Sequence, residues 1–320
     1  MPLSSTPHGG NQNQNTAALD SVAAVGRVSA APTPFSGPLT ALKLDSTTAS
    51  NIDPASGPPR LLPTSASAQS LQRRPESYNN QYDDGGQAGV QIAGGNGYVG
   101  MYSIHSAYQT GQIYLNPWDP TDPNNQFDIL YAPTAHGSDG NCLENGSDYW
   151  TYESQTTTTA AFRVYSFCGN GFVLAKTMNS TFFSAYVRVV GNGHTPTYTT
   201  EMKKFTDGKW HALLYNYNTS SYEDLYSESG TATYNGGQGW VTFETHYTRG
   251  NCSTPPEIDA AGIRVQSPNG TWNYLTTGPW NQYGPYGNCI QTSSPATTIT
   301  FPAPPQITDP QYNDWWATSA

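Results

Sequence analysis

Charged side chains are scarce in this sequence. They make up 11% of its 320 residues, against about 25% in an average soluble domain. Leu, Glu and Lys, on which helix-rich and coiled-coil proteins depend, are also in short supply. No stretch approaches the roughly 18 consecutive apolar residues of a membrane-spanning helix. These shortages argue against a helical bundle and against insertion into a membrane.

Basic residues are the scarcer of the two charged classes. Thirteen Lys and Arg residues stand against 23 Asp and Glu residues, which gives a net charge of −10. Nucleic-acid binding needs a basic surface to contact phosphates, and an acidic surface also disfavours anionic lipid headgroups. We therefore expect no nucleic-acid partner and no membrane partner.

Aromatic and turn-forming residues are abundant instead. The chain has 22 Tyr, 8 Trp, 31 Gly and 25 Pro residues. Segments rich in β-branched and aromatic residues alternate with Gly, Pro and Asn turns. We predict strands at 90–93, 98–108, 127–131, 149–155, 160–167, 171–177, 182–190, 198–205, 210–217, 240–247, 263–266, 272–276 and 297–301. The predicted fold is all-β, a two-sheet antiparallel β-sandwich of the jelly-roll type.

The first 80 residues differ in composition from the rest. They consist largely of Ser, Thr, Ala, Pro, Gly, Gln and Asn, and contain two aromatic residues, Phe35 and Tyr78. Such a segment cannot bury enough apolar surface to offset its backbone entropy. We therefore predict a disordered tail or pro-segment over 1–80 and a single sandwich domain over 81–320.

The four cysteines, Cys142, Cys168, Cys252 and Cys289, allow three pairings. None has the C-x-x-C spacing of a zinc or redox site. We expect Cys142–Cys168 and Cys252–Cys289, because both pairs close local loops. Two disulfides imply an oxidising compartment, so we expect an extracellular protein, although no conventional signal peptide is visible. Five Asn-x-Ser/Thr sequons would mark glycosylated loops if a eukaryotic cell secretes the chain.

One predicted strand, 240–247, combines unlike chemistry on one face. Alternation places Trp240, Glu244 and His246 together, opposite an apolar core face. A carboxyl beside Trp and His suits acid–base chemistry, since the ring raises the carboxyl pKa and the His can carry the partner proton. Glu244 and His246 are therefore candidate catalytic residues, and Trp240 is a candidate ligand-binding residue. A polar outer face without catalysis is the simpler alternative.

Two other predicted strands carry aromatic and basic residues on one side. These residues are Tyr186 and Arg188 in 182–190, and Arg163 and Tyr165 in 160–167. If the strands are neighbours, their open face suits a carbohydrate, because aromatic rings stack on sugars and Arg binds a uronic-acid carboxylate bidentately. An aromatic surface without a ligand is the alternative.

A glycosidase needs a second carboxylate. Glu201 is the next candidate catalytic residue because it also lies in a predicted strand, 198–205, although the sequence cannot place it near Glu244. The sequence has no nucleophile elbow, no H-E-x-x-H motif and no phosphate-binding Gly loop. We expect neither a metal nor a cofactor.

Three functions fit these features. The first is a secreted carbohydrate-binding sandwich whose partner is a polysaccharide or glycan. The second is a two-carboxylate hydrolase or lyase on the same scaffold, either a glycosidase or a glutamic-type peptidase. The third is a structural or adhesive surface protein whose tail acts as a spacer.

Overall fold

The computed structural model describes thirteen stretches of the chain, residues 28–44, 83–92, 94–112, 127–136, 140–152, 159–168, 171–190, 196–230, 238–247, 258–274, 280–286, 297–300 and 315–319. Within them, strands predominate and two short helices occur, η1 (Leu39–Ala41) and α2 (Ser180–Tyr186). Neither helix is long and apolar enough to span a membrane.

The larger sheet has eleven strands. Its main path runs, in spatial order, through β17 (Thr297–Thr300), β18 (Trp315–Ser319), β14 (Ile258–Gln266), β4 (Gly100–Ser106), β10 (Pro196–Lys204), β11 (Trp210–Asn216), β12 (Ser221–Glu228) and β2 (Lys43–Leu44). Three short strands pair beside this path, β1 (Val28–Ser29), β9 (Arg188–Val190) and β15 (Trp272–Tyr274).

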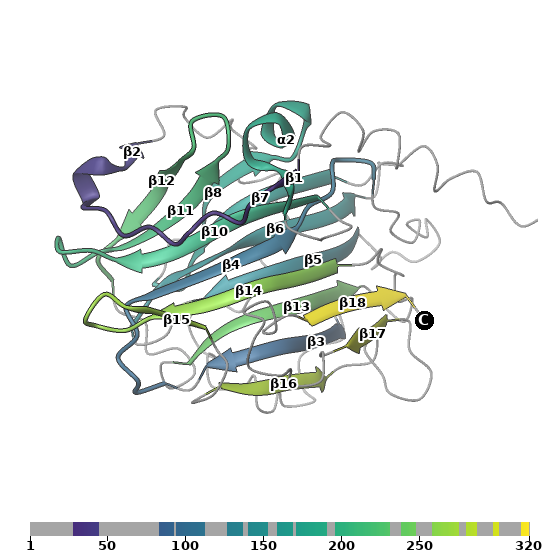
Figure 1. Cartoon of the computed structure of the whole chain (residues 1–320). Helices are drawn as coiled ribbons and strands as arrows, with labels where there is room; N and C mark the ends of the chain where they lie inside the picture. The colour runs from purple at the N-terminus through teal and green to yellow at the C-terminus, as the bar shows by residue number, and fades with distance from the viewer. Residues whose placement is uncertain are drawn as a thin grey trace, which may run out of the picture.

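The smaller sheet has seven strands and lies face to face with the larger one (Figure 1). Its spatial order is β16 (Trp280–Tyr286), β3 (Asp83–Ile92), β13 (Gly239–Tyr247), β5 (Phe127–His136), β6 (Leu143–Tyr152), β7 (Thr159–Ser166) and β8 (Gly171–Thr177). Every pairing in this sheet is antiparallel. The prediction of an all-β, two-sheet antiparallel sandwich is confirmed.

The hydrophobic core fills the space between the inner faces of the two sheets. Phe162 of β7 meets Tyr198 of β10 edge to face, with 5.3 Å between ring centroids. Both side chains are fully buried, and burial of a large apolar side chain contributes about 1.5–3 kcal/mol. The Tyr198 hydroxyl donates to Ser147 Oγ at 3.3 Å. It also contacts His105 Nδ1 at 3.1 Å, so the polar atoms at this point of the core are paired.

The strand predicted over 182–190 is wrong in its first half, which forms α2. The Asn179 side chain accepts hydrogen bonds from the N–H groups of Thr181 and Phe182, at 3.0 and 3.1 Å. Asn in this position is a strong helix N-cap. Phe182 and its neighbour Phe183 are both buried, which a helix allows and a half-buried strand does not. The alternation of apolar residues is therefore a poor guide here.

Residues 28–44, which we call the strap, pack against the outer face of the larger sheet. They lie within the segment that the sequence predicts to be disordered. β1 pairs in parallel with β9, and β2 in parallel with β12. Figure 1 shows the strap, in purple, crossing the strands of this sheet between its two anchoring strands. Residues 1–27 and 45–82 lie outside the described ranges.

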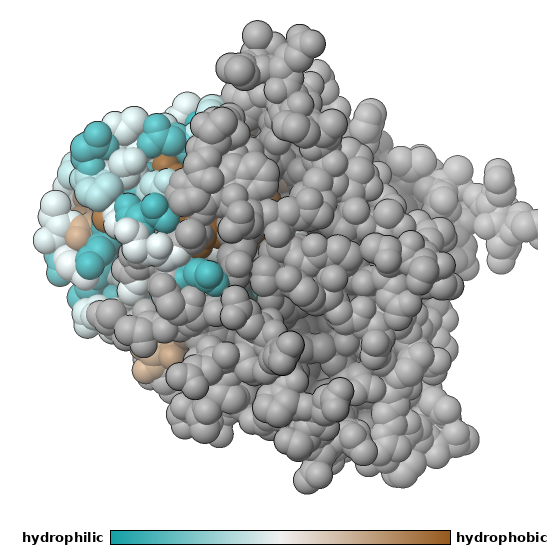
Figure 2. All heavy atoms as spheres, turned by 90° about the horizontal axis from the view of Figure 1, so that it is seen from below, coloured by the Kyte–Doolittle hydropathy of each residue, from teal (hydrophilic) through white to brown (hydrophobic). Residues whose placement is uncertain are grey.

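The predicted disulfide between Cys142 and Cys168 is confirmed. It joins the residue before β6 to a residue just beyond β7, two strands that are paired along their length. Cys252 and Cys289 lie outside the described residues, so the second disulfide stays a prediction. Seen from below, the described residues that reach the surface are mainly hydrophilic, with a few apolar spots (Figure 2).

Candidate functional site

Charged and aromatic side chains gather on the outer face of the smaller sheet. We call this group the Arg163 cluster, and each member is at most 5% exposed: Glu144, Asp148, Arg163, Trp240 and His136. β6 sends alternate side chains to this face. Because Arg163 pairs with Gly146 in the β6–β7 register, it lies between two carboxylates that stand two residues to either side of that glycine.

One guanidinium compensates both carboxylates of the Arg163 cluster. Arg163 forms an ion pair with Asp148 through Nε, and its Nη2 lies 3.7 Å from Glu144 Oε1. Trp240 Nε1 donates to the other oxygen of Glu144 at 3.0 Å. A buried network with this degree of pairing holds strands in register, so its first role is structural.

The ring of Trp240 is enclosed by other rings. His136 stacks on it with 4.1 Å between ring centroids. The Phe167 ring lies nearly perpendicular to it, with 5.8 Å between ring centroids. Burial lowers the pKa of His136 to about 4, so the imidazole is neutral at pH 7 and its Nδ1–H donates to Leu143 O at 2.8 Å. Trp240 therefore presents no open face on which a sugar could stack.

The predicted ligand-binding residues divide into two groups. Trp240, Arg163 and Tyr165 share the outer face of the smaller sheet, with Arg163 Cζ 5.9 Å from the Tyr165 ring centroid. Tyr186 and Arg188 lie beside the larger sheet instead. Tyr186 donates to a glutamate of β12 at 2.7 Å, and Arg188 donates to a carbonyl in the last turn of α2 at 3.0 Å. The open face that combines all five does not form.

The predicted catalytic residues also fall on different sheets. Glu244 and His246 belong to β13 of the smaller sheet, where their backbones pair with β3 and β5. Their side chains lie outside what the structure describes. Glu201 lies on β10 of the larger sheet, so the two predicted carboxylates come from strands of different sheets.

Glu201 and Lys203 bind the main chain of the strap. Both point to the outer face because Met202, which lies between them, and Tyr198 belong to the hydrophobic core. Glu201 Oε2 accepts the N–H of Phe35 at 2.9 Å, and Lys203 Nζ donates to the carbonyl of the same residue at 2.8 Å. An acid and a base thus bind both polar groups of one residue of an extended segment.

Two tyrosines bind strap carbonyls further along. The Tyr102 hydroxyl donates to Pro32 O at 2.7 Å, and the Tyr222 hydroxyl donates to Thr33 O at 3.2 Å. The Phe35 ring packs near Phe205 and Tyr222, with centroid distances of 6.0 and 6.1 Å. We call the residues of the sheet that receive the strap the strap site: Tyr102, Glu201, Lys203, Phe205 and Tyr222.

Burial shifts the pKa values of Glu201 and Lys203, the acid–base pair of the strap site. Glu201 is 1% exposed, and desolvation raises its pKa to about 8, against the lowering effects of the Phe35 N–H and of Lys203. Burial likewise lowers the pKa of Lys203, and the carboxylate opposes that change. Glu201 therefore titrates near neutral pH, the range in which a general acid or base is most effective.

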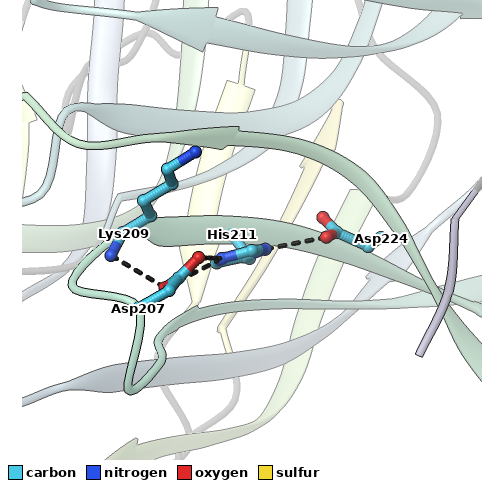
Figure 3. Close-up of polar contacts among 4 residues, drawn as sticks. All are labelled: Asp207, Lys209, His211 and Asp224. Atoms are coloured by element: carbon cyan, nitrogen blue, oxygen red, sulfur yellow. Dashed lines mark hydrogen bonds and ion pairs between the residues drawn. The ribbon is translucent and has the colours of Figure 1, made fainter. Parts of the chain in front are cut away.

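A histidine lies between two aspartates next to the strap site (Figure 3). His211 Nδ1 lies 2.7 Å from Asp224 Oδ2, and Nε2 lies 3.1 Å from Asp207 Oδ2. Burial lowers the pKa of His211, but its hydrogen bonds and charge interactions with both aspartates outweigh burial and raise the pKa above 6.5. Its ring meets Phe205 edge to face at 4.9 Å, which links it to the strap site.

Replacing His211 with Gln is expected to cost about 1–3 kcal/mol of unfolding free energy at pH 6, because the buried Asp224 loses a charged partner. The raised pKa means that this contribution is fully present below pH 6.5 and is lost as the pH rises through the folded value. Urea unfolding at pH 6 and pH 9 measures it. An equal loss at both pH values would contradict a charged pair.

Several residues of these sites were not predicted from the sequence. Asn145-Gly146 is typical of a turn and conceals the alternation that places Glu144 and Asp148 on one face. Lys203 could have been found, because it follows Glu201 by two residues in a predicted strand and must share its face. The contacts of Glu201 and Lys203 with Phe35 join residues more than 160 positions apart, and no local signal predicts them.

The part of the chain that the structure describes contains one group of potential metal ligands. Cys142, Cys168 and Glu228 have ligand atoms within 4.8 Å of one another. The two cysteines are joined as a disulfide, so their sulfurs are not thiolate ligands. This group is therefore no metal site.

No family model matches the sequence, and no curated protein matches it. Among solved structures, scytalido-glutamic peptidase with a peptide-based transition state analog is 10% identical, with a TM-score of 0.38 over 75% of this chain and 100% of that chain. The same peptidase with a transition state analog inhibitor is 9% identical, with a TM-score of 0.37 over 75% of this chain and 98% of that chain. SCP-B, a member of the eqolisin family of peptidases in complex with the tripeptide Ala-Ile-His, is 10% identical, with a TM-score of 0.39 over 75% of this chain and 100% of that chain.

Proposed function

We propose that the protein is a peptide hydrolase that binds extended peptides on the outer face of the larger sheet and uses Glu201 as its acid–base residue. The observation that carries this proposal is the binding of Phe35, whose N–H and carbonyl are held by Glu201 and Lys203. Main-chain groups are common to all peptides, so the same contacts are open to a peptide from another chain.

The two side chains have complementary roles in hydrolysis. The Lys203 ammonium lies at the carbonyl oxygen and stabilises the negative charge that develops there. Glu201, as carboxylate, takes a proton from a water molecule whose oxygen bonds to the carbonyl carbon. The C–N bond to the next residue then breaks, and Glu201 returns the proton to the leaving nitrogen. The products are a carboxylic acid and an amine.

The surroundings of Glu201 support an acid–base role. Its pKa of about 8, set by burial, makes it a stronger base than an ordinary carboxylate. Among the residues that the structure describes, Oε1 has no hydrogen-bond partner, whereas Oε2 contacts the peptide. One oxygen thus binds the peptide, which leaves the other as the oxygen that takes the proton from water. The Cys142–Cys168 disulfide supports an extracellular site of action.

The test uses the full chain with four substitutions that remove the Phe35 ring and the two buried proline rings and so weaken the binding of the strap to the sheet: Pro32→Gly, Thr33→Ser, Pro34→Gly and Phe35→Ser. In this strap-replaced chain, incubation with a peptide mixture is expected to release new termini that mass spectrometry identifies. Adding Glu201→Gln is expected to slow cleavage by about 10²–10⁴-fold. Adding Lys203→Met is expected to lower kcat by about 10²–10³-fold.

Glu228→Gln is the matched control, because Glu228 lies at the end of β12 next to the disulfide, outside the strap contacts. It is expected to leave the cleavage rate unchanged. Absence of cleavage from pH 3 to pH 8 would overturn the proposal, and so would cleavage that persists after Glu201→Gln in the same strap-replaced chain.

A further inference from the structure

The strap shows which side chains the strap site accepts. Pro32 and Pro34 are buried, whereas Ala31 and Thr33 are exposed. This alternation has the period of an extended chain, in which every second side chain faces the sheet. Recognition along the strap therefore falls on the two prolines. Phe35 departs from this alternation, because its half-buried ring contacts Phe205 and Tyr222 and lies 5.4 Å from Lys203 Nζ.

The hydrogen bonds of the strap site suit proline at both buried positions. In the four hydrogen bonds described above, the strap contributes three carbonyl acceptors and one N–H donor, that of Phe35. Proline has no N–H, so Pro32 and Pro34 bring no donor that burial would leave without a partner. Another residue at either place would bring an N–H to a buried position, which costs free energy unless it is paired.

An extended proline-containing segment also loses little entropy on binding. The φ angles of its prolines are fixed near −65°, and polyproline-type segments are preformed for recognition by aromatic surfaces. The strap site supplies such a surface, since Phe205 and Tyr222 lie near the Phe35 ring. The side chains that bind the strap are thus those expected of a site for extended Pro-x-Pro-aromatic peptides.

We infer that the strap is an intramolecular occupant of a peptide site whose ligands in trans are extended segments with two alternate prolines followed by an aromatic residue. Cleavage of such segments rests on the proposed function, whereas their binding does not. A tethered occupant has an effective concentration on the order of millimolar, so the strap excludes other peptides from the strap site until it leaves.

The probe is a fluorescein-labelled peptide with the sequence of residues 29–38, Ser-Ala-Ala-Pro-Thr-Pro-Phe-Ser-Gly-Pro, measured by fluorescence anisotropy. All proteins in this assay carry Glu201→Gln, which keeps an acceptor oxygen for the peptide N–H and removes the acid–base group. We expect the strap-replaced chain to bind the peptide at least about tenfold more tightly than the chain with its native strap. Equal affinity for the two proteins would overturn the inference.

A second peptide, with alanine in place of both prolines, tests the specificity. It is expected to bind the strap-replaced chain about fivefold to tenfold more weakly than the proline peptide. Tyr102→Phe and Tyr222→Phe each remove one donor to a strap carbonyl. Each is expected to weaken the binding of the proline peptide by a similar factor. Affinities unchanged by all three alterations would show that the peptide binds elsewhere.

A second strap variant, Phe35→Ala in the full chain, is tested because the four substitutions of the strap-replaced chain could prevent folding. It removes the ring contacts but keeps both prolines, and an affinity between those of the native and strap-replaced chains is expected. Binding of the proline peptide without cleavage by any Glu201-containing chain would support this inference and overturn the proposed function. Equal cleavage of the proline peptide and the alanine peptide would support the proposed function and overturn this inference.

Discussion

Replacing Arg163 with methionine is expected to lower the unfolding free energy by about 3–5 kcal/mol, because two buried carboxylates then lose their cation. Glu144 and Asp148 are 5% and 0% exposed, so water cannot take over the role of the guanidinium. Methionine keeps the unbranched apolar stem of the side chain, which limits the loss from packing. Urea unfolding at pH 7 measures the change.

The matched experiment removes the charges together. In a chain with Arg163→Met, Glu144→Gln and Asp148→Asn, no uncompensated charge is left, and the loss is expected to be smaller than for Arg163→Met alone. Arg188→Met serves as a control for arginine replacement, since Arg188 is only half-buried and donates to the carbonyls of Ser184 and Val187. A loss below about 1 kcal/mol for Arg163→Met would show that the cluster is hydrated and not a buried network.

The class of fold could be predicted because its signal is local. Alternating apolar residues and turn residues locate strands such as β10, β11 and β13 within one or two residues of their observed ends. β12 was missed because Ser221–Glu228 contains three acidic residues, which weaken the apolar alternation. This strand is held by its tertiary position between β11 and β2, which a sequence pattern does not record.

The site was harder to predict because it depends on which strands are neighbours. The sequence correctly gives Arg163, Tyr165 and Trp240 outward positions, but it cannot show that Glu144 pairs with the tryptophan or that Glu201 lies in the other sheet. Low hydrophobicity correctly describes the strap's composition. It does not reveal that a few prolines and one phenylalanine suffice to anchor a polar segment to an aromatic face.

The second large effect is expected in the pH dependence of stability. Glu201 has a folded pKa of about 8, raised by burial from an ordinary value of 4.5. Its stabilising contribution is therefore fully present below pH 4.5 and is lost as the pH rises through 8. His136 acts in the opposite sense, because its lowered pKa of about 4 gives stability above pH 6.5 that is lost as the pH falls. The interval from pH 6.5 to pH 8 is thus the one in which Glu201 dominates over His136.

Across that interval, the native chain is expected to lose about 1.5–2 kcal/mol more unfolding free energy than the Glu201→Gln variant, since one bound proton contributes about 1.4 kcal/mol per pH unit. Urea unfolding at pH 6.5 and pH 8 gives this difference, and the contribution of His211, common to both proteins, cancels. The range stops at pH 8 because Glu201 releases its proton near this pH in the folded chain. Equal slopes for the native chain and Glu201→Gln would mean that Glu201 is already ionised beneath the strap, and that water reaches it there.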